Sequence, residues 1–232
     1  MADINIFGEP GKDGVPGTNG ANGAPGQIGP NGNFGQFWGG FAAGNGGRGG
    51  DGQSGSSGGG GQTGHDGGTL IVNAKDIVVG VNINAYGGDG GKGGSGGMGG
   101  QGGQGGKGGE IPNAPDPPTH SQRGNGGDGG NGGKGGDAGL GGDGGKGGSV
   151  VIVAGNLTIG PVSGSARGGS GGLSGATGAG GKEGLPGQGR NEGQSGSPGP
   201  NGMIPSKRPD GESTNGTGKS GSAGSINIVQ RI

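Results

Sequence analysis

A strict three-residue glycine repeat constrains this chain more than any other feature. Residues 87–109 read GGDGGKGGSGGMGGQGGQGGKGG, and residues 126–148 repeat this GGX pattern almost without a break. Two glycines in each triplet leave nothing for a packed side-chain core, and glycine loses more backbone entropy on ordering than any other residue. A flexible spacer needs glycine but no fixed period. The unbroken period therefore favours an ordered chain with three residues per turn, the polyproline II shape.

A chain of this shape has no hydrogen bonds of its own. Because buried backbone N–H and C=O groups must be paired, such legs have to pair sideways with one another. Glycine allows this pairing because no Cβ holds the backbones apart. We expect Asp and Lys in the third column of the triplets to be solvated and to balance each other in charge.

The composition excludes several ordinary classes of protein. Of 232 residues, 82 are Gly and only 22% are hydrophobic, which is too few for a conventional core of this size. The net charge is −1, so neither nucleic acid nor an anionic membrane is expected as a partner, and no apolar run is long enough for membrane insertion. Absence of Cys excludes disulfides and thiolate metal sites. The N-terminal residues lack the features of a signal peptide, so we expect virion or cytoplasmic synthesis, with extracellular use open through a non-classical route.

Four strand-like segments separate three glycine-rich excursions. The strand-like segments are residues 3–7, 69–85, 149–166 and 225–232. The excursions are residues 8–68, 87–148 and 168–224. The two long apolar segments align with each other as an internal repeat, and the two chain ends match complementary halves of the same unit.

This repeat predicts one domain spanning residues 1–232, of a mostly β fold class. We expect a bundle of about six polyglycine II helices on a small base of short β-strands, with a three-fold internal repeat. Three strand pairs would form the base, one of them built from the two chain ends. Two alternatives stay open: a β base with disordered glycine loops, and a collagen-like trimer through the Gly-X-Y run at residues 8–35.

Phased glycine legs with irregular, aromatic-bearing turns resemble proteins built from polyglycine II bundles. Two kinds share the pattern: the glycine-rich adhesins at the tips of phage long tail fibres and, more distantly, the snow flea antifreeze protein. The resemblance covers the glycine legs, about two thirds of this chain. It implies a helix-bundle architecture and, for the adhesins, a role in binding cell surfaces.

Catalysis is not expected. The only histidines, His65 and His120, lie in different excursions, and no carboxylate falls in an evidently apolar setting. We therefore predict no catalytic residues, no metal site and no cofactor.

Binding residues are expected at the apices of the excursions, because loops held on a rigid scaffold are where such residues concentrate. An aromatic patch at the first apex offers stacking surface to sugars or apolar contact to a protein receptor. The predicted apical residues are Phe34, Phe37, Trp38, Phe41, Pro117, His120, Met203 and Arg208. The predicted partner is a cell-surface glycan or protein receptor. Alternatively, the aromatic residues only close the end of the bundle.

A second functional hypothesis is self-assembly into a filament or matrix. The incomplete strand at each chain end is a partner for the other, either within one chain or between copies joined head to tail. The strand residues assigned to this pairing are Ile4, Ile6, Ile226 and Ile228. Ice binding is a remote third alternative.

Overall fold

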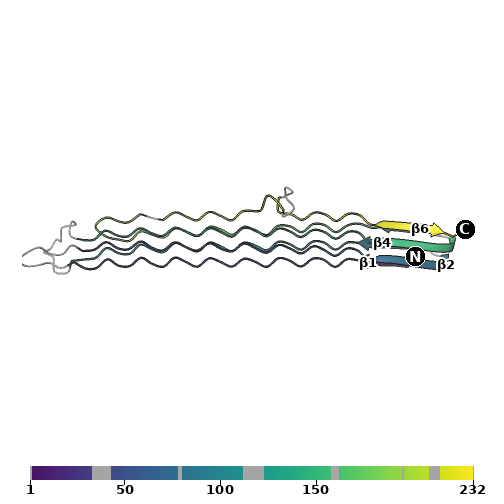
Figure 1. The fold of residues 1–232 in the computed structure, drawn as a ribbon, viewed down its shortest axis with the longest axis horizontal. Helices are drawn as coiled ribbons and strands as arrows, with labels where there is room; N and C mark the ends of the chain where they lie inside the picture. Colours follow the sequence, from purple (N-terminus) through teal and green to yellow (C-terminus); the bar gives the residue numbers. More distant parts are fainter. Residues whose placement is uncertain are drawn as a thin grey trace, which may run out of the picture.

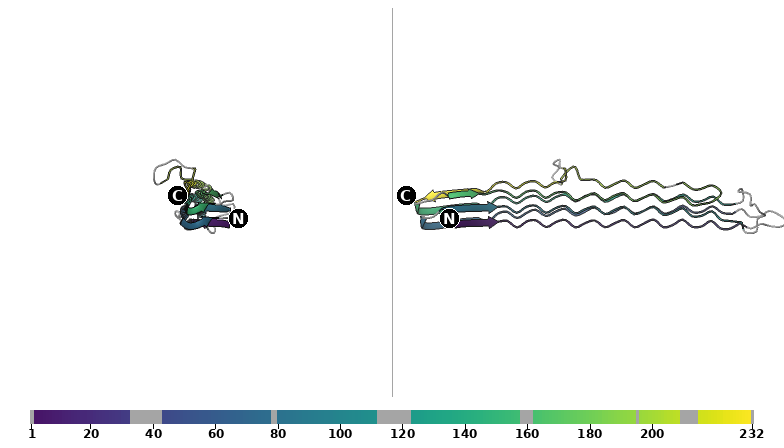
Figure 2. Two further views of the ribbon diagram at one scale, coloured as in Figure 1. Left: turned by 90° about the vertical axis from the view of Figure 1, so that its right-hand side faces the viewer. Right: turned by 180° about the vertical axis from the view of Figure 1, so that it is seen from behind.

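The computed structural model describes residues 2–32, 43–77, 80–111, 123–157, 162–194, 196–208 and 215–231. These residues form a long, narrow rod, with all the strands gathered at one end and glycine-rich legs running along the rest (Figure 1). Both chain termini lie at the strand end (Figures 1 and 2).

Six strands of the described residues form two parallel sheets. The strands are β1 (Ala2–Phe7), β2 (Thr69–Ile77), β3 (Val81–Tyr86), β4 (Ser149–Leu157), β5 (Val162–Ser165) and β6 (Ser225–Gln230). One sheet has the order β1-β3-β5 and the other β2-β4-β6, and every pairing is parallel. The odd-numbered strands enter the legs and the even-numbered strands return from them (Figure 2).

Alternation of side chains along the strands creates a small core between the two sheets. In β3, Val81, Ile83 and Ala85 are buried, while the residues between them are less buried. In β4, Val150 and Ile152 are buried in the same way and pack in the same cluster. Because successive strand residues point to opposite faces, these buried side chains of β3 and β4 point toward the other sheet.

This architecture corrects the predicted fold class. The described residues contain no helix, and their strands do not form three pairs on which a helix bundle could stand. The two terminal strands do not pair with each other: β1 pairs with β3, and β6 pairs with β4. The three predicted strand pairs join strands that follow each other in the sequence, or the two chain ends. In the structure, each strand pairs with the equivalent strand of the next repeat.

The glycine-rich residues run as six extended legs within the described chain. They are leg 1 (8–32), leg 2 (44–68), leg 3 (87–110), leg 4 (124–148), leg 5 (167–189) and leg 6 (the described part of 193–224). Legs 1, 3 and 5 continue the sheet β1-β3-β5, and legs 2, 4 and 6 continue the other sheet (Figure 2). Neighbouring legs run parallel within a layer and antiparallel between the layers.

Backbone hydrogen bonds join the legs once in every triplet. Gly11 N donates to Asp89 O at 2.8 Å and Gly14 N to Lys92 O at 2.7 Å, and this spacing continues along legs 1 and 3. The Gly-X-Y residues of leg 1 therefore bond within their own chain, as a collagen trimer would not allow. The legs are ordered by this lattice, which also excludes the alternative of disordered glycine loops for the described residues.

The GGX pattern belongs to the two central legs, 3 and 4. Gly87 N donates to leg 5, at Arg167 O, and Gly88 N donates to leg 2, at His65 O. A leg bonded on several sides has no room for a Cβ at either glycine. A Cβ on Gly130 would lie 1.9 Å from Gly50 O, and one on Gly133 would lie 2.0 Å from Gln53 O. Legs with the GGX pattern therefore lie inside the lattice, and the Gly-X-Y residues of leg 1 lie at its side.

Asx side chains form a second set of bonds between parallel legs. Within each pair, an Asp or Asn Oδ1 accepts from the backbone N–H of the third-column residue on the next leg, as Asp13 does from Lys92 and Asn19 from Met98. Other acceptors of this kind are Asn22, Asn31, Asn45, Asp51, Asp66, Asp89, Asp128, Asn131, Asp137 and Asp143. These side chains are thus structural, and the expectation of a merely solvated column is incomplete.

Leg 6 is interrupted midway by a loop. Ala138 N donates to Met203 O, and the next triplet, Gly141 N, donates to Gly216 O, so residues 203 and 216 occupy consecutive lattice positions. Arg208 holds the loop by an ion pair with Asp143 of leg 4. Gly216 has φ of 88°, a conformation that favours glycine at the point of return.

Candidate functional site

Most of the predicted apical residues lie outside the described residues: Phe34, Phe37, Trp38, Phe41, Pro117 and His120. The other two lie partway along leg 6 and not at the far end of the rod: Met203 is the last lattice residue before the loop, where its carbonyl oxygen accepts from Ala138 N, and Arg208 lies in the loop and pairs with Asp143. The chain passes from leg 5 to leg 6 around residues 190–192 instead, where Arg190 N donates to Gly124 O.

The predicted assembly residues lie mainly in the core. Ile4, Ile6 and Ile226 pack against the buried cluster between the sheets, and Ile228 is 41% exposed. Their side chains therefore hold the two sheets together. The free edges of β1 and β6 offer only backbone groups to another strand.

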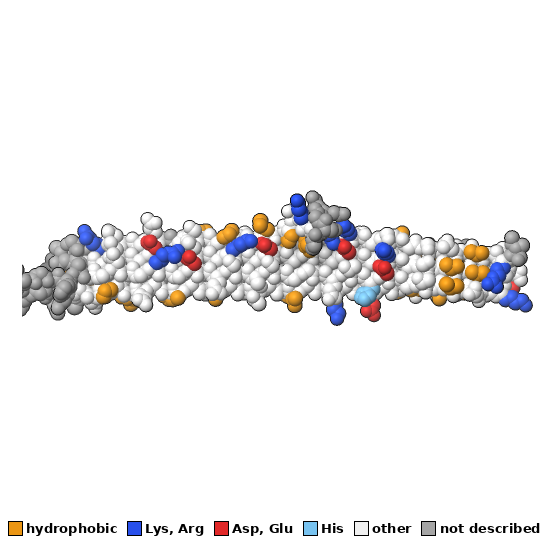
Figure 3. All heavy atoms as spheres, viewed as in Figure 1, with side chains coloured by type: hydrophobic (Ala, Val, Ile, Leu, Met, Phe, Trp, Pro, Cys, Tyr) orange, Lys and Arg blue, Asp and Glu red, His pale blue; other side chains and the backbone are white. Residues whose placement is uncertain are grey.

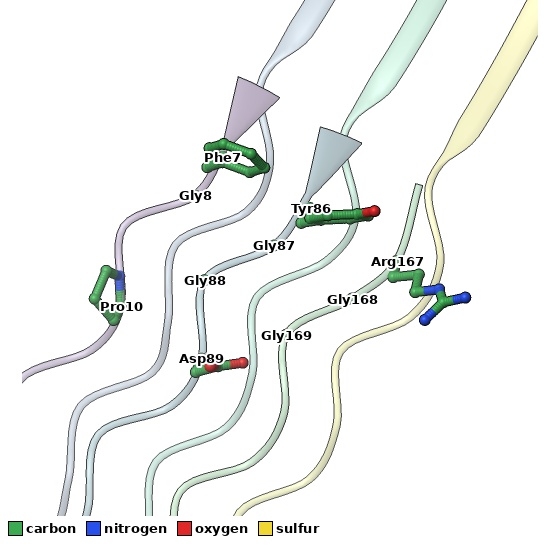
Figure 4. A pocket seen from close by; sticks show the side chains of 10 residues that line it. All are labelled: Phe7, Gly8, Pro10, Tyr86, Gly87, Gly88, Asp89, Arg167, Gly168 and Gly169. Carbon is green, nitrogen blue, oxygen red and sulfur yellow. The ribbon is translucent and has the colours of Figure 1, made fainter. Parts of the chain in front are cut away.

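A hollow of about 460 Å³ lies where the sheet β1-β3-β5 passes into legs 1, 3 and 5. Its floor is made of backbone, because glycines follow each strand at this level (Figure 4). Its side chains are Phe7, Pro10, Tyr86, Asp89 and Arg167. They come from three parallel segments and lie in two adjacent rows (Figure 4).

Two aromatic rings form the first part of the hollow. Phe7 and Tyr86 stack with ring centroids 5.7 Å apart and an angle of 29° between the ring planes. The pair is fixed from below because β1 and β3 are in register at these residues and Gly8 N donates to Tyr86 O at 2.8 Å. Phe7 is nevertheless 61% exposed, so the stacked pair presents a broad apolar surface to solvent.

Polar side chains hold the aromatic pair from the strand side. Tyr86 Oη donates to Asn84 Oδ1 at 3.0 Å, and Asn84 Nδ2 donates to Asn5 Oδ1 at 2.9 Å. One row further, Ser163 Oγ donates to Asn82 Oδ1 at 3.2 Å. Cross-strand pairs of this kind stabilise the face of a sheet. The outer face of this sheet is therefore a flat, ordered array of amides and hydroxyls that ends at two rings.

Two charged groups stand beside the rings. Arg167 is the first residue of leg 5 and is exposed, and its carbonyl oxygen accepts from Gly87 N at 2.9 Å. Asp89 Oδ1 accepts from Ser170 N at 2.7 Å, which leaves its other oxygen directed away from the lattice bond. A guanidinium and a carboxylate beside stacked rings supply both hydrogen-bond donors and acceptors next to an apolar surface.

The repeat alignment contains the signal for this site. Three residues stand directly before the first glycine of a leg, at equivalent positions of successive repeat units: Phe7, Tyr86 and Arg167. Equivalent residues of in-register parallel strands lie side by side. The predicted strand pairing is wrong and the predicted binding residues are at the apices of the excursions, so the prediction does not include this site, which three repeats form together.

No group of three or more His, Cys, Asp or Glu side chains in the described part could hold a metal ion. Within the same residues, no helix is long and apolar enough to cross a bilayer.

Comparisons with known proteins give little beyond this geometry. No family model matches the chain, and no curated protein matches it. Among solved structures, the chain is similar to a springtail antifreeze protein from Granisotoma rainieri, described as a nine polyproline type II helical bundle. The two share 27% identity over 82% of this chain and 93% of that one, with a TM-score of 0.14, too low to support an argument about fold or function. None of these comparisons supports the resemblance to phage adhesins.

Proposed function

We propose that the protein is a non-enzymatic binding scaffold that recognises carbohydrate at the hollow beside Phe7 and Tyr86. The observation that carries this proposal is the exposed, stacked aromatic pair set between a polar amide array and two charged side chains. A sugar ring has an apolar face and a rim of hydroxyls. Such a ring can stack on the aromatic pair while its hydroxyls bond to Arg167 and Asp89.

The lattice of legs supports this function by holding the site in place. Gly8, Gly87 and Gly88 continue directly from the strands into bonds with neighbouring legs. A site whose backbone is already ordered loses less conformational entropy when a ligand binds. The shallow shape suits a sugar within a longer glycan, because both ends of a bound ring stay open to solvent.

Binding to a set of immobilised oligosaccharides tests the proposal. The variants Phe7→Ser and Arg167→Ala should each weaken binding of the best-bound glycan at least about tenfold, since each removes one side of the site. Leu185→Ser is the matched control, because Leu185 is 62% exposed but lies on leg 5 away from the hollow. Equal binding by all three folded variants, or no binding by the parent to any glycan, would contradict the proposal.

The apical aromatic residues define an independent test of the same function. Trp38→Ser together with Phe41→Ser should leave glycan binding intact if the hollow is the site. Loss of binding in this variant, with binding kept in Phe7→Ser, would move the site to the first apex.

Self-assembly is a second candidate function, favoured by one observation. The terminal strands β1 and β6 each have one hydrogen-bonded neighbour and do not pair with each other, so both keep a free edge. Such edges can pair with strands of another copy. Filaments of the purified chain in negative-stain micrographs would support this function, and single rods at every concentration would oppose it.

A further inference from the structure

The outer face of the sheet β2-β4-β6 carries a patch of apolar side chains, unlike that of the other sheet. Ile71 is 61% exposed and Val229 48%, and Val151 and Val153 between them are half-buried. We call these four residues the outer apolar patch. Figure 3 shows hydrophobic side chains gathered over the strand end of this face, with basic side chains beside them.

An apolar patch left uncovered is unusual on a parallel sheet. Parallel sheets are typically covered on both faces, and their strands read as near-continuous apolar runs. The runs LIV in β2, VVIV in β4 and INIV in β6 follow this rule. The other sheet differs, because its outer face carries Asn5, Asn82 and Asn84, whose amides bond to one another or to hydroxyls.

We infer that a second copy of this chain covers the outer apolar patch, giving a two-fold dimer whose rods point in opposite directions. A two-fold interface brings the same surface of both copies together. With the strands antiparallel and the axis centred on the patch, Val153 of each copy faces Val151 of the other. In β2 and β6, Ile71 and Val229 then lie over Asn73 and Asn227.

The charges beside the patch favour this antiparallel arrangement. Lys75 and Arg231 border a shallow hollow of about 390 Å³ at Gly155, at the end of the patch remote from the legs. In the antiparallel dimer these cations meet the hydroxyl row Thr69, Ser149 and Ser225, where Ser149 Oγ and Ser225 Oγ are 3.1 Å apart. A parallel two-fold arrangement would instead bring Lys75 of one copy over Arg231 of the other.

The mid-shaft loop gives a second reason for this arrangement. Arg208 of the loop pairs with Asp143, a leg 4 residue in the layer that continues this sheet. Two rods stacked in parallel along their whole length would bring the two loops into collision. Overlap of the strand ends alone leaves both loops outside the contact.

A lipid surface is the competing occupant, since cations border an apolar patch. The legs that continue this sheet give an anionic bilayer no added attraction, because acidic and basic side chains stand side by side on them. Asp51 of leg 2 pairs with Arg48, and Asp137 of leg 4 pairs with Lys134. The second copy covers only the strands.

Sedimentation velocity of the full chain tests the inference. The parent should form a dimer about twice as long as the monomer, and Ile71→Asn with Val229→Asn should raise the dimer dissociation constant at least about tenfold. Leu185→Asn makes the same kind of substitution at an exposed residue of leg 5, outside the patch, and should leave the dimer unchanged. Thermal unfolding of each variant confirms that it is folded.

The arrangement is tested by cross-linking, because the chain has no Cys of its own. A mixture of Thr69→Cys and Lys75→Cys chains should give covalent dimers with a short bismaleimide, whereas either variant alone should give few. A monomer at all concentrations, a dimer unaffected by the patch variants, or binding to vesicles of phosphatidylserine and phosphatidylcholine through the patch would overturn the inference. Long filaments would instead point to the free strand edges.

Discussion

At the scale of single residues, glycine and Asx divide the work of holding the legs together. Glycine lets two backbones approach, and its N–H makes the lattice bond. An Asp or Asn in the third column then bonds the N–H that faces solvent on the next leg, as Asn131 does for Ser197 N at 2.8 Å. The glycine contacts are predictable from the sequence, because their period is visible. The Asx bonds are not, because the bonded residues are 66 to 81 positions apart.

Replacing both Gly130 and Gly133 by Ala should destabilise the rod strongly. Each new Cβ would lie within 2.0 Å of a backbone oxygen. Overpacking of this kind typically costs about 1–3 kcal/mol for each site, and here backbone, not a side chain, has to move. Thermal unfolding measures the effect, with Lys134→Ala on the same leg as the control. A double variant that melts with the parent would show that the lattice does not carry the stability.

Asn131→Ala should cost more than an ordinary surface substitution. Asn131 accepts from Ser197 N, so its removal leaves one backbone donor without its protein partner, at a cost of about 1 kcal/mol. Asn131→Asp should keep most of the stability, since Asp fills the equivalent place in other triplets. Chemical denaturation of the two variants compares them directly. An alanine variant as stable as the aspartate variant would contradict the role of the Asx bonds.

Acid should weaken the rod through the same bonds. The backbone N–H of Asn131 lowers the pKa of Asp51, and that of Met203 lowers the pKa of Asp137, with Arg48 and Lys134 adding to the effect. A carboxyl whose pKa is lower in the folded state contributes stability above its unfolded pKa of about 4, and that stability is lost as the pH falls through the folded value.

The unfolding midpoint should therefore be level from neutral pH to about pH 4 and fall below it. Asp51→Asn with Asp137→Asn keeps both acceptors and should reduce the fall of the unfolding midpoint in acid. A fall that is as steep in this variant as in the parent would place the pH dependence elsewhere.

At the scale of elements, the legs were predictable and the strand pairing was not. The period of three and the position of the GGX runs indicate extended, laterally bonded legs with 3 and 4 in the centre. Strand pairing depends on which repeat unit lies beside which, and the alternation in residues 69–85 fits a hairpin as well as two separate strands. The hollow at Phe7 and Tyr86 forms only if these residues belong to two separate strands, so the wrong pairing does not predict the site.

The loop in leg 6 should be removable. Residues 203 and 216 occupy consecutive lattice positions, so deleting residues 204–213 restores the triplet phase. Asp143 loses the ion pair to Arg208 but still accepts from Lys219 N at 2.7 Å. We expect the shortened chain to fold with an unfolding midpoint close to that of the parent. Failure to fold would show that the loop is part of the rod's core structure.

At the scale of the whole molecule, the strand end is the only place with a hydrophobic core among the described residues. Deleting residues 1–7 removes Ile4 and Ile6 from that core, at about 2 kcal/mol for each side chain, and it removes the bonds of β1 to β3. We expect a clear fall in the unfolding temperature of single rods. A filament former would also stop polymerising, so microscopy and calorimetry of this variant separate the two candidate functions.

The direction of the lattice bonds makes the rod mechanically anisotropic. Each bond crosses from one leg to the next, and each leg is held to its neighbours by a bond in every triplet. Stretching the rod from end to end would load these bonds in shear, many at a time. Pulling on the two chain ends is different, because both lie at the strand end, on edge strands (Figure 1). Force applied there would peel off β1 or β6 and then its leg, a few bonds at a time, so the molecule resists stretching from end to end far better than a pull on its own termini.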